Sequence, residues 1–255
     1  MRYYRQEHAG RAAALNLGCK NSRGNIVLFI DSHGLLDASC LDEHYKAHLK
    51  TEGSDVALVF GHLALIGDIA NFGRKDFSAT KQQQKWMLKH EQDPFRACKT
   101  GNVSIRKTIL EKIGGFDEDF KGYGFEDAEF GLRLKKAGYR FKANWLATIY
   151  VFSLHQTLAG RCQKMREAGH NAVLFRKKHP WIGLQLVNPI SRSAYYLYTL
   201  FGQARLKQVL RKLRLSPDNK LLQNKLRNFC HSLGIAEALH PKLKLPTTEE
   251  LLALN

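Results

Sequence analysis

The sequence lacks paired cysteines and long apolar runs, and each absence excludes a class of protein. Its five cysteines are scattered, with no Cys-x-x-Cys pair (Cys19, Cys40, Cys98, Cys162 and Cys230). This argues for reduced thiols and against a thiolate zinc site. No run reaches the roughly 18 apolar residues that a membrane-spanning helix needs, and residues 1–6 lack the apolar core of a signal peptide. We therefore expect a cytoplasmic protein, soluble or peripheral at the inner face of the membrane.

Acidic residues are also scarce, since 23 Asp and Glu stand against 40 Lys and Arg, a formal net charge of +17. Such an excess favours anionic partners, namely a nucleotide diphosphate, acidic lipid headgroups or nucleic acid. No helix-turn-helix, zinc-finger or RNA-binding signature accompanies the charge, so we expect no specific nucleic-acid partner. A hydrophobic content of 44% and a charged content of 25% are typical of a globular chain.

Hydrophobic patterning predicts an α/β fold, because strand-like and helix-like segments alternate along the chain. The expected strands are residues 2–5, 25–30, 56–66 and 147–154, and the expected helices are 8–18, 41–49 and 81–91. Residues 67–80 form a loop without a recognisable motif. In the segment 81–91, Trp86, Met87 and His90 are expected to pack rather than bind.

The helix at 41–49 is amphipathic, with Leu41, Tyr45 and Leu49 on one face. His44 and His48 are four residues apart and could ligate a metal. A solvated helix face is the more ordinary interpretation of this pair.

Residues 101–141 contain the densest pattern, in which glycine-rich turns precede an acidic helix start. Phe130, Leu134 and Ala137 recur at helical spacing, and Gly138 is a natural C-terminal stop. Three acids, Glu126, Asp127 and Glu129, therefore lie at the N-terminal turn, where the helix dipole stabilises negative charge. An ordinary capped helix would explain them. So would catalysis, since an adjacent Glu-Asp pair can divide orientation of a hydroxyl from proton acceptance.

A second polar cluster follows the apolar run at 25–30, where Asp31-Ser32-His33-Gly34 begins. Ligands of open α/β sheets bind at the carboxyl ends of strands. Asp31 and His33 could point toward one cation and leave positions free for diphosphate oxygens. A polar turn after a buried strand is the alternative.

These motifs together resemble the family 2 glycosyltransferases of the GT-A type. The resemblance rests on Gly-Gly-Phe-Asp-Glu at 114–118 and Gly-x-Glu-Asp-x-Glu at 124–129, as in galactosyl- and N-acetylgalactosaminyltransferases. Residues 2–33 resemble the family's third strand, Asn-x-Gly helix and metal-binding Asp-x-Asp strand. His33 replaces the last Asp, as in the polypeptide N-acetylgalactosaminyltransferases, and Leu15 stands where the family often has arginine.

The resemblance implies a fold, a cofactor and a set of site residues. The fold would be a truncated GT-A mixed sheet flanked by helices at residues 1–178, followed by a basic, mostly helical region at 179–255. Asp127 would be the catalytic base, with Glu126 holding the acceptor hydroxyl. Mn²⁺ or Mg²⁺ would bind to Asp31, His33 and His155. The implied substrate-binding residues are Gly101, Asn102, Gly122, Tyr123, Gly124, Phe125 and Arg161.

The implied reaction is transfer of a sugar from a nucleotide-diphosphate donor, UDP-sugar by preference, to a hydroxyl of a glycan or lipid-linked acceptor. The Glu-Asp pair favours inversion, because the retaining N-acetylgalactosaminyltransferases have Glu-Asn there. The polar segment 156–171 would be a lid that excludes water. Arg161 within it could meet the diphosphate.

In the family that the chain resembles, two further strand-helix units, which hold uracil and ribose, normally precede the point where this chain starts. The true start could lie upstream, a partner chain could supply the missing half, or the chain could be a decayed fragment. The alternative function is therefore a non-catalytic remnant or partner subunit. The basic amphipathic helix at 204–215 and the apolar face at 222–233 could lie on an anionic membrane surface or dock on their own protein.

Overall fold

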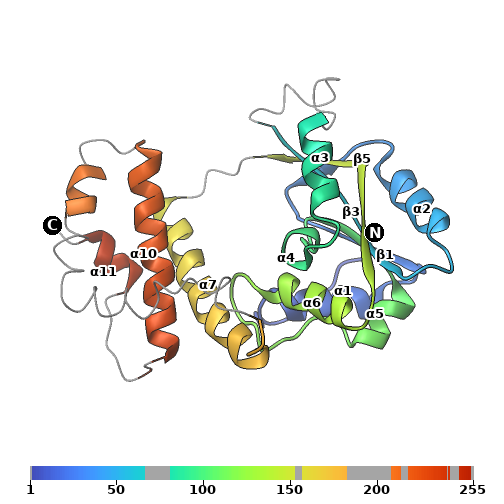
Figure 1. Ribbon diagram of the computed structural model, residues 1–255. Coiled ribbons are helices and arrows are strands. Elements are labelled where there is room, and N and C mark those ends of the chain that lie inside the picture. The colour runs from blue at the N-terminus through green and yellow to red at the C-terminus, as the bar shows by residue number, and fades with distance from the viewer. Residues whose placement is uncertain are drawn as a thin grey trace. The chain divides into compact units, whose positions relative to one another are not determined.

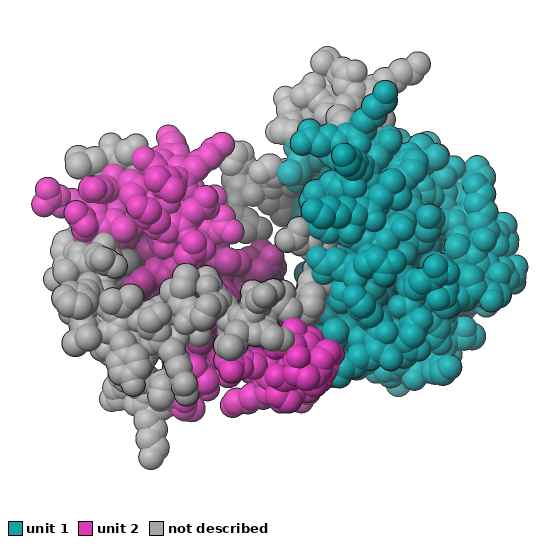
Figure 2. Space-filling model, in the orientation of Figure 1, with its two compact units in different colours: residues 1–118, 126–155 teal, residues 119–125, 156–255 magenta. Residues whose placement is uncertain are grey.

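The computed structural model describes residues 2–66, 81–152, 157–182, 208–213, 218–239, 241 and 247–253. It divides into two compact units, coloured separately in Figure 2. The first, here the sheet unit, comprises residues 1–118 and 126–155, and the second, the helical unit, comprises 119–125 and 156–255. The boundary predicted at residue 178 is thus not the point at which the compact units divide.

The sheet unit is built on a mixed sheet, as predicted. Its strands are β1 (Ile26–Ile30), β2 (Gly34–Leu36), β3 (Val56–Ile66), β4 (Asn102–Arg106) and β5 (Arg140–Phe152). Their order is β1-β4-β3-β5-β2, with β3 and β5 parallel and the other neighbours antiparallel (Figure 1). The strand expected at 2–5 was wrong, since those residues form no element. The strand expected at 147–154 begins earlier, at Arg140, and residues 153–156 lie outside the described part.

Six helices of the described residues belong to the sheet unit. They are α1 (Arg11–Asn21), α2 (Cys40–Lys50), α3 (Lys81–Lys89), α4 (Pro94–Ala97), α5 (Lys107–Ile113) and α6 (Glu126–Lys136). Helices α1, α5 and α6 lie on one side of the sheet and α2 on the other (Figure 1). Strand β4 alternates accordingly, because Val103 and Ile105 join the main core while Asn102 and Ser104 face α2.

The sheet register brings three separate parts of the chain to one edge of the sheet. Ile30 at the end of β1 pairs with Asn102 at the start of β4. Phe60 of β3 pairs with Val103, so the next residues of β3, Gly61 and His62, reach the same edge. Asp31, which follows Ile30 directly, therefore lies beside the residues that begin β4.

The helical unit contains α7 (Leu158–Lys178), α10 (Lys220–Leu239), α11 (Thr248–Ala253) and a helical segment at 208–213. A shared core is formed by Cys162, Leu210, Leu213, Leu226, Cys230 and Leu233. The apolar face predicted at 222–233 is therefore buried against α7, which favours docking on the protein over membrane binding. No helix in the described part of the chain is long and apolar enough to cross a membrane.

Two predictions about helices need correction. The polar segment expected to form a lid is, from Leu158 onward, part of the 21-residue helix α7. Helix α2 presents the opposite face from the one its leucines suggest, because Leu41, Tyr45 and Leu49 are 61%, 54% and 50% exposed, whereas His44 and His48 are buried.

Candidate functional site

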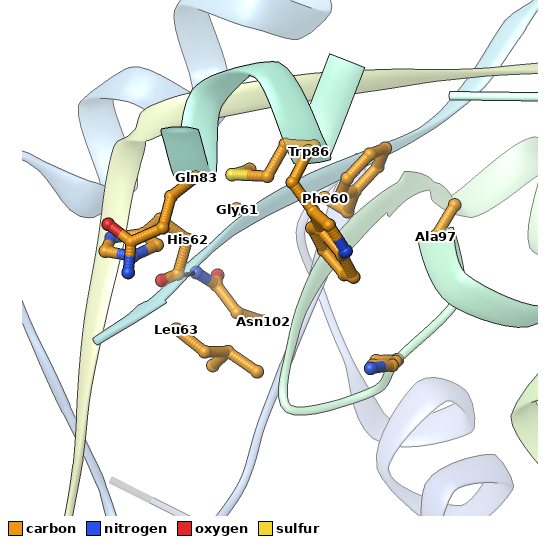
Figure 3. Close-up of a pocket in the computed structure, with 10 residues that line it drawn as sticks. Phe60, Gly61, His62, Leu63, Gln83, Trp86, Ala97 and Asn102 are labelled. Atoms are coloured by element: carbon orange, nitrogen blue, oxygen red, sulfur yellow. Dashed lines mark hydrogen bonds between the residues drawn. The ribbon is translucent and has the colours of Figure 1, made fainter. Parts of the chain in front are cut away.

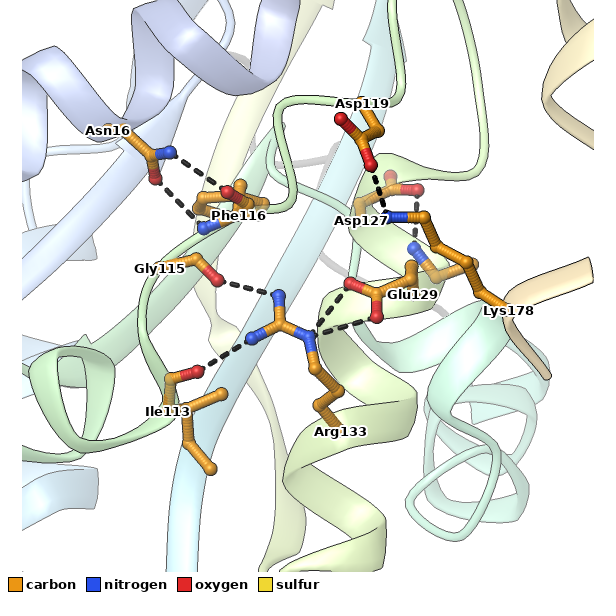
Figure 4. Close-up of polar contacts among 10 residues, drawn as sticks. Asn16, Ile113, Gly115, Phe116, Asp119, Asp127, Glu129, Arg133 and Lys178 are labelled. Atoms are coloured by element: carbon orange, nitrogen blue, oxygen red, sulfur yellow. Dashed lines mark hydrogen bonds and ion pairs between the residues drawn. The ribbon is translucent and has the colours of Figure 1, made fainter. Parts of the chain in front are cut away.

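Helix α6 begins at Glu126, so all three acids of its first turn lie where they were predicted. Glu129 is fully occupied by Arg133, whose Nε donates to both carboxylate oxygens at 2.9 Å. The same guanidinium donates to the carbonyls of Ile113 and Gly115 at 2.7 and 2.6 Å (Figure 4). This carboxylate therefore fixes the helix to the glycine turn at 114–115.

The glycine turn is held from the other side by Asn16 of α1. Its amide donates to the Phe116 carbonyl at 2.9 Å and accepts from the Phe116 N–H at 2.8 Å (Figure 4). Gly114 and Gly115 have φ values of 86° and 70°, a left-handed conformation that favours glycine. The Gly-Gly-Phe motif thus anchors α6, and with it the acids at its start.

Asp127 and Glu126 differ from Glu129 in having few partners. Asp127 accepts a 2.8 Å hydrogen bond from the N–H of Ala128. Burial, followed by repulsion from Glu126, raises the pKa of Asp127 to about 6. Glu126 is 1% exposed, and neither of its carboxylate oxygens accepts a hydrogen bond from the described residues.

Arg11 of α1 connects this helix start to the end of β1. One guanidinium nitrogen, Nη2, donates to Asp31 Oδ1 at 3.0 Å and to Thr100 Oγ1 at 2.8 Å, while Nη1 lies 3.3 Å from Glu126 Oε1. Sequence reasoning missed Arg11. It lies four residues before Leu15, so it occupies the same helix face one turn earlier than the family's arginine.

The candidate metal ligands are only partly described. Asp31 and His33 flank the turn that leads into β2, whereas His155 lies outside the described residues. Asp31 Oδ2 accepts no hydrogen bond from the described residues, and a Cβ at Gly101 would come within 2.9 Å of it. An oxygen and an imidazole ligand fit Mn²⁺. Within the described ranges, no group of three His, Cys, Asp or Glu residues forms a metal site.

Asn102, a predicted substrate-binding residue, also makes hydrogen bonds that connect elements of the fold. Its amide nitrogen donates to the carbonyls of His62 and Ala147 at 2.9 Å each, and its oxygen lies 2.9 Å from His44 Nε2. The side chain therefore joins β3, β5 and α2, and its role toward substrate stays a prediction.

His44 and His48 form a buried chain with Ser104, which corrects the expectation of a solvated face. His44 Nδ1 and His48 Nε2 lie 2.8 and 2.9 Å from the Ser104 hydroxyl. Burial lowers the pKa of both imidazoles, that of His48 to about 4. Both rings are hydrogen-bonded to protein, so neither is arranged as a metal ligand.

The aromatic loop at 122–125 is shaped by α7 within the helical unit. Asn171 Nδ2 donates to the carbonyls of Lys121, Tyr123 and Gly124, and Glu167 accepts from the Tyr123 N–H at 3.0 Å. Phe125 has a φ of 74°, an uncommon conformation for a non-glycine residue. Sequence reasoning found the loop but neither of the two α7 residues that hold it.

Arg161, the α7 residue that was predicted to bind substrate, contacts α10. Its Nη2 donates to Gln223 Oε1 at 3.2 Å, within the helical unit. Binding of substrate by Arg161 and by the 122–125 loop stays a prediction.

The sheet unit thus places the Asp-x-His turn after β1 and the Glu-Asp pair at the start of α6 on either side of Arg11. The family model described as "Glycosyltransferase like family 2" matches residues 1–155. The chain therefore belongs to this family, which confirms the resemblance that its motifs predicted.

Two curated relatives come from Pasteurella multocida. A hyaluronan synthase is 41% identical over 110 residues, and a chondroitin synthase of strain Pm70 is 36% identical over 172 residues. These matches cover 42% and 65% of this chain, but only 11% and 16% of the relatives' own lengths. The chain thus corresponds to a small part of each synthase.

A distant solved structure also matches. It is the mannosyltransferase PcManGT from Pyrobaculum calidifontis in complex with GDP-Man and Mn²⁺, at 16% identity and a TM-score of 0.49. The match covers 92% of this chain and 68% of that one. At this low identity and TM-score, the likeness gives no information about the site.

Proposed function

We propose that the chain transfers a sugar from a nucleotide-diphosphate donor, UDP-sugar by preference, to a hydroxyl of a glycan or lipid-linked acceptor. The observation that carries this proposal is Asp127, whose pKa is raised to about 6 at the start of α6. A base with a pKa near the working pH is the most effective proton acceptor. The names of the two relatives, which give hyaluronan and chondroitin as products, support a glycan acceptor.

In the proposed reaction the acceptor hydroxyl attacks the anomeric carbon of the donor sugar and gives its proton to Asp127. A glycosidic C–O bond forms as the bond from that carbon to the diphosphate oxygen breaks, and the configuration inverts. Glu126 accepts a hydrogen bond from the acceptor, which would satisfy a carboxylate that the described residues leave without one.

A divalent cation, Mn²⁺ or Mg²⁺, would be held by Asp31 and His33, with His155 as the predicted third ligand. When bound, it would supply positive charge to the departing diphosphate. Arg11 supports this arrangement, because its guanidinium holds Asp31 Oδ1 and leaves Oδ2 free of hydrogen bonds from the described residues. The basic chain, at +17, would add attraction for the anionic donor.

The test combines donor binding with transfer. We expect UDP to bind the full chain in calorimetric titration in the presence of Mn²⁺. The Asp127→Asn variant should keep this binding while losing transfer by a factor of about 10² to 10⁴, the usual contribution of a general base. Glu111→Gln, which removes an exposed carboxylate on α5, is the control.

Full activity of Asp127→Asn would contradict its assignment as the base. Absence of UDP binding by folded protein would favour the non-catalytic alternative, a remnant or a subunit completed by a partner chain.

A further inference from the structure

A cavity of about 240 Å³ lies in the sheet unit, between β3 and α3. In the view of Figure 3, His62 and Gln83 lie at one end of it and Ala97 at the other, with Trp86 extending from the same helix as Gln83. A cavity of roughly 150 Å³ accepts a benzene molecule. The present one therefore has room for a single six-membered sugar ring.

His62 gives this cavity an unused donor and acceptor. The side chain is only 5% exposed, and neither ring nitrogen has a hydrogen-bond partner in the part of the chain that the structure describes. Burial lowers the pKa of His62, so its imidazole is neutral and offers one N–H donor and one nitrogen acceptor. Buried polar atoms are normally paired, and hydroxyl groups of a bound sugar would supply the partners.

Trp86 and Lys99 give the cavity a flat wall and a positive charge. Trp86 is 46% exposed although it borders a cavity, and Lys99 Nζ lies 5.8 Å from the centre of its ring. Lys99 is exposed, and no carboxylate of the described residues forms an ion pair with it. An aromatic face packs against the apolar face of a sugar ring, and a free ammonium recognises an anion.

The cavity adjoins the candidate catalytic residues. Leu63, which borders the cavity, and Asp31 are both neighbours of Gly101, since a Cβ added there would lie 3.7 Å from Leu63 Cδ1 and 2.9 Å from Asp31 Oδ2. Lys99 directly precedes Thr100, whose hydroxyl accepts a 2.8 Å hydrogen bond from Arg11, and the same guanidinium lies 3.3 Å from Glu126, the neighbour of Asp127.

We propose that this cavity is an acceptor subsite that takes the terminal sugar of the acceptor and requires an anionic substituent on it, a carboxylate or a sulfate. The ring packs on Trp86, its anionic group pairs with Lys99, and its hydroxyls pair with His62. The proposal rests on the proposed function, because it takes Asp127 as the base that receives the acceptor proton.

The position of the charge favours the acceptor over the donor as occupant. In the proposed function the diphosphate of the donor lies at Asp31, whereas Lys99 is linked through Thr100 and Arg11 to Glu126, which with Asp127 meets the acceptor. An anionic sugar beside Lys99 would neutralise a cation that is otherwise unpaired among the described residues.

The test compares three oligosaccharide probes that differ only in the terminal sugar: glucuronate, glucose and glucose 6-sulfate. Saturation-transfer NMR measures binding without turnover, and kcat/KM is measured where transfer occurs. We expect an anionic probe to be preferred over glucose by about ten-fold to a hundred-fold, the effect of a charge-assisted hydrogen bond. Preference for glucuronate or for the sulfate identifies which anion is the natural one.

Variants then test whether the preference for an anionic probe arises in the cavity. Lys99→Gln should bring the ratio of anionic to neutral probe close to one, and Lys99→Arg should restore it. Lys112→Gln removes an exposed lysine that stacks on Tyr139, away from the cavity, and should leave the ratio unchanged. The ratio cancels any general effect of Lys99 on Asp127. His62→Leu should weaken binding of all three probes.

The proposal is overturned if the glucose probe binds as well as the anionic probes, if Lys99→Gln leaves the ratio unchanged, or if Lys99→Gln changes only the KM of the donor. None of these outcomes abolishes UDP binding or transfer, so they are distinct from failure of the proposed function. That failure would appear as loss of UDP binding and of transfer to every acceptor, and the NMR preference would still test the cavity.

Discussion

Glu126 and Glu129 lie in the same turn of α6 and are almost equally buried, at 1% and 2% exposure. Glu129 receives two hydrogen bonds from Arg133, whereas neither oxygen of Glu126 accepts one from the described residues. Burial of an unpaired carboxylate costs free energy that pairing largely offsets. The contrast therefore separates an acid whose hydrogen bonds build the helix start from one whose described partner is the ion pair with Arg11.

Two buried histidines, His44 of α2 and His62 of β3, show the same contrast. His44 is bonded to Asn102 and Ser104, while His62 is equally inaccessible and has no bonded ring nitrogen in the described part of the chain. Residue type and burial are the same in the two cases, so neither can indicate function. The presence or absence of protein partners is what differs, and the predictions below test whether it has the consequences that we infer.

The substitution Arg133→Met, which removes the partner of Glu129, should have the largest effect. The substitution keeps most of the apolar stem but leaves Glu129 buried without its cation, so we expect the free energy of unfolding to fall by about 3–5 kcal/mol. Chemical denaturation with urea measures it. Arg23→Met, an exposed arginine, is the control and should change stability by less than about 0.5 kcal/mol. Equal effects of the two variants would show that the Arg133 bonds do not hold α6.

Acid should destabilise the folded protein by protonating the buried, hydrogen-bonded His48. Burial, the nearby Arg106 and His44 lower the pKa of His48 from 6.5 to about 4. A folded-state pKa below the unfolded value means that the stabilisation is complete above pH 6.5 and is lost as the pH falls toward 4. At about 1.4 kcal/mol per pKa unit, the loss is about 3 kcal/mol.

The measurement is the denaturation midpoint as a function of pH between 7 and 4. A His48→Gln variant cannot titrate at this position, so its slope over that range should be shallower than that of the natural chain. His8→Gln, at an exposed histidine, should keep the original slope. An unchanged slope in His48→Gln would contradict the assignment of the acid sensitivity to the buried chain.

The matched pair His44→Leu and His62→Leu tests the comparison between histidines directly. Leucine at 44 leaves the Asn102 oxygen buried without its partner, which should cost about 1–3 kcal/mol. Leucine at 62 removes two nitrogens that have no partner among the described residues, so stability should stay the same or rise. Thermal unfolding measures both. A loss at His62 as large as that at His44 would mean that His62 also has a structural role.

Local patterns in the sequence were enough to predict much of this fold and part of the site. The apolar run of β1, the strand-like run of β3 and the helix start at Glu126 depend on neighbouring residues, and each lies where it was predicted. Glycine turns are equally local, since Gly114 and Gly124 both have positive φ. Such features need no knowledge of what packs against them.

The rest depends on partners that are distant in the sequence. Helix α2 faces inward with its histidines because Asn102 and Ser104, 58 and 60 residues away from His44, offer hydrogen bonds there. The position of Arg11 depends on its hydrogen bond to Thr100, which is 89 residues away in the sequence. In the same way, Asn171 holds a loop about 50 residues earlier in the chain. Periodicity alone contains none of this information.

The smallest expected effect concerns the adjacent acids Glu126 and Asp127. Repulsion from Glu126 is, after burial, the second cause of the raised pKa of Asp127. In Glu126→Gln that repulsion is absent, so the pKa of Asp127 should fall, and the protonated fraction at pH 6 with it. Carbon-13 NMR of the Asp127 carboxyl gives the midpoint directly, and the acid limb of the pH–rate profile should move to lower pH by the same amount. Glu111→Gln on α5 should move neither the Asp127 midpoint nor the acid limb.

An unshifted midpoint in Glu126→Gln would mean that Arg11, 3.3 Å from Glu126, already cancels the charge of Glu126 at Asp127. Glu126 would then be a neutralised structural carboxylate, similar to Glu129, and Asp127 alone would remain open for the acceptor.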